Sequence, residues 1–185
     1  MSYFDFSANV GERLDGYVCF SEGPREFWFR PKKFEEFLND LDNILQLYYE
    51  NGGRGSLFPS LSDCQLLKVG IPCAAKLSVN DRWCRARVAN QMGVVQFVDI
   101  GHKQLCLLES IKPLARQFSE FMSPAAVHCK VVNFQQLSTA GYPKLFDPVA
   151  IIIRSKVEPY RVTVESLISP PTSICRRLLN RQVKS

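Results

Sequence analysis

Short apolar segments that recur about every ten residues between positions 73 and 108 constrain this fold more than any other feature. They cover residues 73–77, 83–89, 93–100 and 103–108, with polar turns at residues 79–81 and 90–91. Segments that are this short, evenly spaced and separated by polar turns are typical of antiparallel strands. The stretch 65–115 is therefore predicted to form a small antiparallel β-barrel.

A predicted strand pair and a long helix precede this stretch. Residues 14–20 alternate between two faces, and residues 26–30 form a returning strand after a turn at residues 21–24. Apolar residues then recur at three- and four-residue spacing from Phe34 to Tyr48. This pattern predicts a helix over about residues 32–51, which Gly52-Gly53 would end.

The segment after the barrel supplies the missing partners for the first strand pair. It is predicted to contain a helix at 111–122, strands at 127–134, 148–153 and 160–167, and a closing helix at 174–183. An isolated two-stranded ribbon is unstable in water. The N-terminal strands are therefore expected to pair with the C-terminal ones, so that the barrel is inserted into a second, discontinuous β domain.

The charge of the chain does not by itself indicate a nucleic-acid-binding protein. The formal net charge is +5, and much of the excess lies in residues 176–184. No segment approaches the roughly 20 apolar residues that span a bilayer. The first residues lack a basic region followed by an apolar stretch, so neither a secretory signal nor a membrane partner is predicted.

The cysteines predict neither disulfides nor a metal centre. The sequence has seven, an odd number, and most lie in or beside apolar stretches, which is typical of buried, reduced thiols. No C-x-x-C pair occurs, and His128 and Cys129 are adjacent, which disfavours binding of one ion by both side chains. No metal and no other cofactor is predicted.

Several segments, in the same order along the chain, resemble the extended Tudor domain. They are Leu14-Asp15-Gly16-Tyr17-Val18, Glu26-Phe27-Trp28-Phe29-Arg30-Pro31, Gly70-Ile71-Pro72-Cys73-Ala74-Ala75-Lys76, Trp83-Cys84-Arg85-Ala86-Arg87-Val88, residues 94–102, and Ile111-Lys112-Pro113-Leu114. The resemblance implies a mainly β fold with helices (α+β). A Tudor barrel of SH3 type, residues 65–115, would be inserted into an oligonucleotide-binding (OB), staphylococcal-nuclease-like domain. That outer domain would comprise residues 1–64 and 116–185, with the long helix joining the two parts.

Members of this family bind peptides that contain symmetrically dimethylated arginine, mostly from Piwi-clade Argonautes. The resemblance therefore implies a non-catalytic scaffold module of the piRNA pathway, cytoplasmic and located in perinuclear germ granules (nuage). Its partner would be an arginine-rich N-terminal peptide of a Piwi-clade Argonaute. A methylated guanidinium keeps its charge and is weakly hydrated, so the family encloses it in a cage of aromatic faces.

The residues at the positions of that cage depart from the family pattern. Leu77 and Cys84 stand where two aromatic residues are expected, and Phe97 keeps the third. The family's Asp-Tyr-Gly-Asn turn is Asp99-Ile100-Gly101-His102 here. The predicted peptide-binding residues are thus Leu77, Cys84, Phe97, Asp99, Ile100 and His102. Losing three aromatic partners at about 0.5 kcal/mol each would weaken methylarginine binding more than tenfold. The predicted ligand is therefore an arginine-containing peptide that is unmethylated or that is bound with little regard to methylation.

Several alternatives remain open from the sequence. Asp99 either receives an incoming guanidinium or satisfies backbone donors of its turn. Other functions are RNA binding through the OB-like half by Tyr17, Phe27 or Phe29, association with itself or other Tudor proteins, and residual dimethylarginine reading. Catalysis is not predicted, since the nuclease-like segments lack paired acids and arginines in order. Only two histidines are present to activate a cysteine.

Overall fold

The computed structural model describes residues 3, 5–51, 68–137 and 141–167, which form two compact units. Unit 1 comprises Glu36–Pro124 with Tyr3 and Asp5, and unit 2 comprises Phe6–Glu35 and the described residues from Ala125 onward. Residues 54–64, whose turn-rich sequence predicts a loop, and the predicted closing helix at 174–183 lie outside the described residues. The division into domains at residues 65 and 115 stays a prediction.

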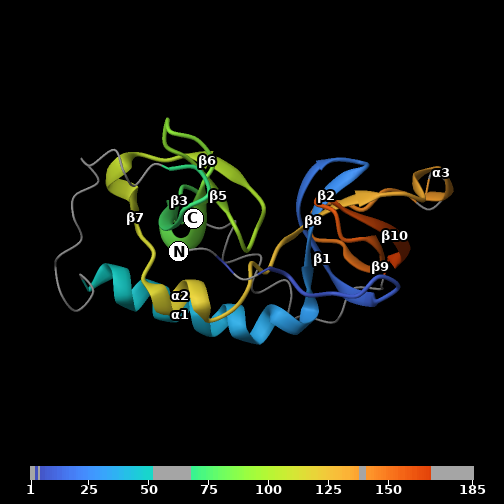
Figure 1. Cartoon of the computed structure of the whole chain (residues 1–185), viewed down its shortest axis with the longest axis horizontal. Coiled ribbons are helices and arrows are strands. Elements are labelled where there is room, and N and C mark those ends of the chain that lie inside the picture. The colour runs from blue at the N-terminus through green and yellow to red at the C-terminus, as the bar shows by residue number, and fades with distance from the viewer. Residues whose placement is uncertain (1–2, 4, 52–67, 138–140, 168–185) are drawn as a thin grey trace. The chain divides into compact units, whose positions relative to one another are not determined.

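Unit 2 is a closed five-stranded barrel whose strands come from both sides of unit 1 in the sequence. The strands are β1 (Arg13–Gly23), β2 (Glu26–Pro31), β8 (Val127–Val131), β9 (Pro148–Ser155) and β10 (Tyr160–Leu167). Their order around the barrel is β1-β2-β8-β10-β9, so the two blue strands complete one barrel with the three orange-to-red strands in Figure 1. The short helix α3 (Phe134–Leu137) follows β8. The predicted OB-type domain built from distant segments is confirmed.

The pairing of β1 explains why the N-terminal ribbon is stable in this protein. β1 pairs on one side with β2 and on the other with β9, where Leu14 lies opposite Ile151. Inward-facing residues such as Val18 and Phe29 are fully buried in the barrel core. Gly16 allows the closest approach of β1 and β2, because a Cβ there would collide with the carbonyl oxygen of Arg30.

Unit 1 contains a second five-stranded sheet, antiparallel throughout. Its strands are β3 (Pro72–Leu77), β4 (Arg82–Val88), β5 (Val94–Phe97), β6 (Lys103–Leu105) and β7 (Ile111–Pro113), in the order β6-β5-β4-β3-β7. Side chains from β3, β4, β5 and β7, together with Cys106, enclose one small core that includes Ala75, Val88 and Ile111. The small barrel predicted from the ten-residue spacing is confirmed.

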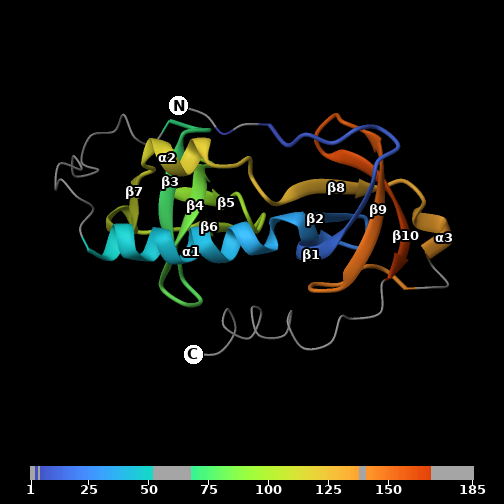
Figure 2. The same ribbon diagram turned by 90° about the horizontal axis from the view of Figure 1, so that it is seen from below.

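Two helices cover the outer face of this sheet. α1 (Glu35–Glu50), preceded by the 3₁₀ turn η1 (Lys32–Phe34), runs across the strands in Figure 2, and α2 (Arg116–Glu120) follows the 3₁₀ turn η3 (Leu108–Ser110) and β7. Leu41, Leu45 and Tyr49 of α1 form a second core with Trp83 and Phe118. Trp83 is a core residue, as predicted, with 3% of its surface exposed.

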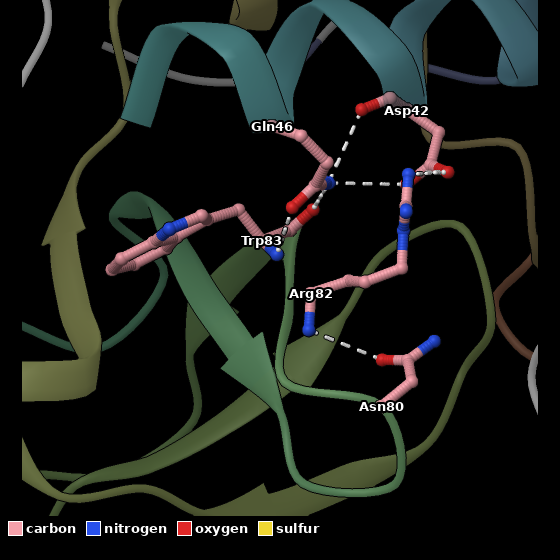
Figure 3. A network of polar contacts seen from close by, with 5 residues as sticks. All are labelled: Asp42, Gln46, Asn80, Arg82 and Trp83. Atoms are coloured by element: carbon pink, nitrogen blue, oxygen red, sulfur yellow. Dashed lines mark hydrogen bonds and ion pairs between the residues drawn. The ribbon is translucent and has the colours of Figure 1, made fainter. Parts of the chain in front are cut away.

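Gln46 connects α1 directly to the backbone of β4. Its Nε2 donates to the carbonyl oxygen of Trp83 at 2.8 Å, and its Oε1 accepts from the amide nitrogen of Trp83 at 2.8 Å (Figure 3). The amide side chain thereby supplies both hydrogen bonds that a neighbouring strand would otherwise provide. One turn earlier, Asp42 pairs with Arg82 at 2.6 Å in the same network.

Replacing Gln46 with alanine is expected to lower the free energy of unfolding by about 2–3 kcal/mol, because it strands the buried amide and carbonyl groups of Trp83. Urea denaturation followed by tryptophan fluorescence measures this change. Arg82→Met is the matched control, since the Arg82–Asp42 pair is about 40% exposed and is expected to contribute less than about 1 kcal/mol. Equal losses in the two variants would contradict the special role of Gln46.

Three local predictions were wrong. Residues 111–113 form strand β7 instead of the start of a helix, because they pair with β3 and because a residue before proline, here Lys112, favours extended backbone. The strand predicted over 93–100 ends at Phe97, where the chain turns. The strand predicted over 127–134 ends at Val131, and α3 begins at Phe134.

The apolar stripe of α1 is also wider than the surface it covers. Phe37 and Ile44 were expected in the stripe, yet about half of the surface of each is exposed.

No described helix is both long and apolar enough to cross a membrane.

The described cysteines are free thiols, and most are buried; they are Cys19, Cys73, Cys84, Cys106 and Cys129. Burial raises the pKa of the Cys73 thiol to about 12. It therefore stays protonated and unreactive in the folded state.

Candidate functional site

The predicted binding residues come from three strands of unit 1 and one turn. Leu77 ends β3, Cys84 lies in β4, and Phe97 ends β5. The turn that follows is closed by two hydrogen bonds: Gly101 N donates to Phe97 O at 2.7 Å, and Phe97 N donates to His102 O at 2.9 Å. Gly101 has a φ of 93°, a conformation that favours glycine and explains why this residue follows Ile100.

The apolar members of the set lie together, but the inner ones are core residues. Phe97 is fully buried and Leu77 is 6% exposed, and both belong to the barrel core. Cys84 and Ile100 are half-buried and pack against that core. Phe97 therefore has no free aromatic face to offer a ligand, and the accessible part of the set is formed by Cys84, Ile100 and His102.

His102 extends this apolar surface with a polar ring. Its imidazole is parallel to the Phe97 ring within 5°, with ring centroids 6.4 Å apart. Burial lowers the pKa of His102 below its ordinary value, so the ring is neutral at neutral pH. A neutral imidazole offers one hydrogen-bond donor and one acceptor, as the amide of an asparagine also does.

Asp99 already binds an arginine of its own chain. Arg85 Nε donates to Asp99 Oδ2 at 2.9 Å, and Arg85 Nη2 donates to Oδ1 at 2.6 Å, a bidentate ion pair. The Arg85 side chain is completely buried, and 15% of the Asp99 side chain is exposed. Both carboxylate oxygens are thus engaged by an internal guanidinium of the kind that a peptide ligand would bring.

Because Arg85 alternates with Ala86, it is predicted to point outward from its strand; it does so, but its side chain is completely buried and not exposed to solvent. Its guanidinium also donates to the carbonyl oxygens of Phe118, Met122 and Ser123, at 3.0, 2.9 and 3.1 Å. These are the carbonyls at the end of α2 and just beyond it, and they carry the negative end of the peptide dipoles. The alternation of side chains along β4 correctly places Arg85 on the face of the strand opposite Ala86. The outer face of β4, however, is covered by helices, as the neighbouring Trp83 already indicated.

Tyr3 packs beside the guanidinium of this ion pair. The Arg85 guanidinium carbon lies 5.3 Å from the centre of the Tyr3 ring, and the Tyr3 hydroxyl donates to Ala86 O at 2.9 Å. Burial raises the pKa of Tyr3 well above its ordinary value, against the smaller opposing effect of Arg85. Neither Tyr3 nor Arg85 was singled out from the sequence as part of the site. The available signal was that Arg85 lies two residues from Trp83 in β4, so both side chains lie on the same, covered face of the strand.

The aromatic residues considered for RNA stacking in unit 2 are mostly core residues. Phe27 is 1% exposed and Phe29 is fully buried, so neither offers a face to a base, whereas Tyr17 is half-buried. Arg25 instead lies 4.2 Å above the ring of Phe134.

Comparison with known proteins places these observations in one family. The family model described as Tudor domain matches residues 8–133. The chain is 33% identical over 119 residues to the Tudor and KH domain-containing protein of Mus musculus, and 24% identical over 162 residues to Tudor domain-containing 6 of Danio rerio. These matches cover 62% and 86% of the chain but only 20% and 7% of the relatives, so it spans a small part of their length.

A solved structure with the same fold is an extended Tudor domain of mouse TDRD1 in complex with a MILI peptide that contains dimethylarginine. It aligns with a TM-score of 0.69 at 20% sequence identity and covers 98% of this chain and 95% of the mouse chain. The similarity extends over both units, which identifies the fold as that of an extended Tudor domain.

Proposed function

Because this chain belongs to the Tudor domain family, we propose that it is a non-catalytic module that binds an arginine-containing peptide with little regard to methylation. The peptide would come from the arginine-rich N-terminal segment of a Piwi-clade Argonaute, in the cytoplasm and in perinuclear germ granules. The shared fold with a TDRD1 domain solved with a MILI peptide supports this class of partner.

One observation supports the indifference to methylation: the positions that would form the cage offer no accessible aromatic face. Cys84 and Ile100 are aliphatic or thiol groups, and Phe97 is fully buried. Methyl groups on a guanidinium gain attraction mainly from aromatic faces stacked against them. An apolar surface accommodates the stem of an arginine whether or not its end is methylated.

Because Asp99 already pairs with Arg85, we propose that the arginine of the ligand does not pair with Asp99. An incoming guanidinium would have to displace a buried bidentate partner, which costs more than a second ion pair returns. We therefore propose that His102, which is half-buried and follows Ile100 in the turn, contacts the ligand arginine; a neutral imidazole has one nitrogen that can accept a hydrogen bond. Flanking peptide residues would supply the rest of the affinity.

Isothermal titration calorimetry with matched peptides tests the proposal. One peptide carries an unmodified arginine and the other a symmetrically dimethylated arginine in the same sequence. Their dissociation constants are expected to agree within about threefold, a difference below 1 kcal/mol. A preference of more than about tenfold for the methylated peptide would overturn methylation-independent binding. Failure to bind either peptide would overturn the choice of partner.

Restoring aromatic residues at the two accessible cage positions is expected to create methyl preference. In the double variant Cys84→Tyr with Ile100→Tyr, two new faces at about 0.5–1 kcal/mol each should favour the dimethylated peptide by about 5- to 30-fold. The same calorimetry measures this ratio. Leu105→Tyr, at an exposed position in β6, is the control and should leave the ratio unchanged. An unchanged ratio in the double variant would place the arginine elsewhere.

A further inference from the structure

Three metal-ligating side chains converge on the outside of the barrel of unit 2, the unit that does not contain the candidate peptide-binding residues. Glu22 lies near the end of β1, Glu26 begins β2, and His128 lies in β8. β2 pairs with both β1 and β8, and His128 lies directly opposite Trp28, two residues along from Glu26. Residues two apart on a strand share a face, so pairing alone brings these groups together.

The ligand atoms of the three side chains face one another. His128 Nε2 lies 3.8 Å from Glu26 Oε2 and 4.0 Å from Glu22 Oε2. All three ligand atoms lie within 4.8 Å of one another. His128 Nε2 is buried and has no hydrogen-bond partner among the described residues. A buried imidazole nitrogen without a partner is costly, and it points to a group that is bound there.

Neighbouring residues orient each of the three ligands. The His128 ring stacks on Trp28, with centroids 4.7 Å apart and planes within 8°. Trp28 Nε1 donates to Glu22 Oε1 at 3.4 Å, and Lys130 Nζ pairs with Glu26 Oε1 at 3.0 Å. In each glutamate, Oε1 is therefore bound by a neighbouring side chain, and Oε2 faces the imidazole of His128. Outer contacts of this kind orient the ligands of protein metal sites.

We propose that Glu22, Glu26 and His128 bind a divalent transition-metal ion, with Zn²⁺ the best match. One imidazole and two carboxylates suit Zn²⁺, whereas Ca²⁺ and Mg²⁺ prefer oxygen ligands alone. Bonds of about 2.0–2.2 Å in a tetrahedron place ligand atoms roughly 3.3–3.6 Å apart. Rotation of the two glutamates, whose side chains are about one-third exposed, closes the remaining difference. Three protein ligands leave a fourth position for water or for a group of a partner.

The competing interpretation is a protonated His128 that pairs with two carboxylates and binds no metal. At 3.8 and 4.0 Å these separations exceed the distance of an N–H···O hydrogen bond. A charged imidazole beside two carboxylates would be expected to form at least one such bond. The absence of such a bond favours a metal ion over a proton as the group between the three ligand atoms.

Titration of chelator-treated protein with Co²⁺ and Zn²⁺ tests the site. We expect one ion to bind per chain, with a Co²⁺ spectrum that lacks the intense thiolate charge-transfer band, and an increase of the melting temperature in Zn²⁺. Glu22→Gln and Glu26→Gln, at positions that are about one-third exposed, should each weaken binding at least tenfold and leave the fold intact. His102→Asn, the other histidine of the chain, is the control and should bind as the wild type does.

Three results would overturn the proposal. The first is a thiolate band, which would place the ion on cysteines. The second is equal affinity in the wild type and in the Glu22→Gln, Glu26→Gln double variant. The third is no binding at millimolar Co²⁺, which would leave the three side chains as a protonated ion-pair cluster only.

Discussion

Replacing Arg85 with methionine is expected to lower the free energy of unfolding by about 3–5 kcal/mol, the cost of breaking a buried ion pair from one side. Methionine fills part of the volume but donates no hydrogen bond. Asp99 would lose both donors of its ion pair, and three carbonyl oxygens around the end of α2 would lose theirs. Although burial works to lower the pKa of Arg85, Asp99 raises it, and the net shift is upward.

Chemical denaturation of the variant measures this loss, and two further variants make the result specific. Arg87→Met removes a neighbouring arginine that is only half-buried and that donates to Gln96, and it is expected to cost about 1 kcal/mol. In the double variant Arg85→Met with Asp99→Asn, the loss should be clearly smaller than the sum of the two single losses. Additive losses, or a loss below 1 kcal/mol for Arg85→Met, would contradict the role of the pair.

The variant Phe97→Ala is expected to lose about 3–5 kcal/mol of stability, as a large cavity in a closed core does. Phe97 is fully buried among residues of the barrel core, including Leu77 and Ile111. Thermal and urea denaturation measure the change. Phe121→Ala is the matched control, because Phe121 is 55% exposed, and it should cost less than about 1 kcal/mol. Similar effects in both variants would show that Phe97 is accessible to solvent.

This expectation affects how peptide binding should be examined. Loss of binding in Phe97→Ala would report unfolding as readily as a lost contact, so the variant cannot locate the ligand. Variants at Ile100 and Cys84 change the accessible surface, and both residues pack on the core only from its edge. They are the informative positions.

The sequence predicted the architecture of both units because each depends on local patterns. Alternation along residues 14–20 and the ten-residue spacing of the barrel segments are properties of single strands and their turns. The instability of a lone ribbon then required the pairing of β1 with β9. The prediction failed where a neighbour decides the conformation: residues 111–113 have helical spacing, yet the free edge of β3 makes them a strand.

The site could be predicted in position but not in its internal contacts. The turn motif located Asp99, Ile100 and His102, whereas the partner of Asp99 depends on where α2 ends relative to β4. Three carbonyl oxygens from a helix end created a buried acceptor site that only a guanidinium fills. No spacing in the sequence encodes that arrangement.

The barrel of unit 2 also has a consequence for how the protein is made. β1 and β2 leave the ribosome before unit 1, but the strands that close their sheet, β8 and β9, follow only after residues 36–124 have been synthesised. A hairpin alone is not stable in water, so the nascent chain carries an unfinished sheet edge until β8 and β9 have been synthesised. Unit 1 can fold during this time. Residues 13–31, which form β1 and β2, are then the segment that a chaperone specific for exposed strand edges would be expected to bind.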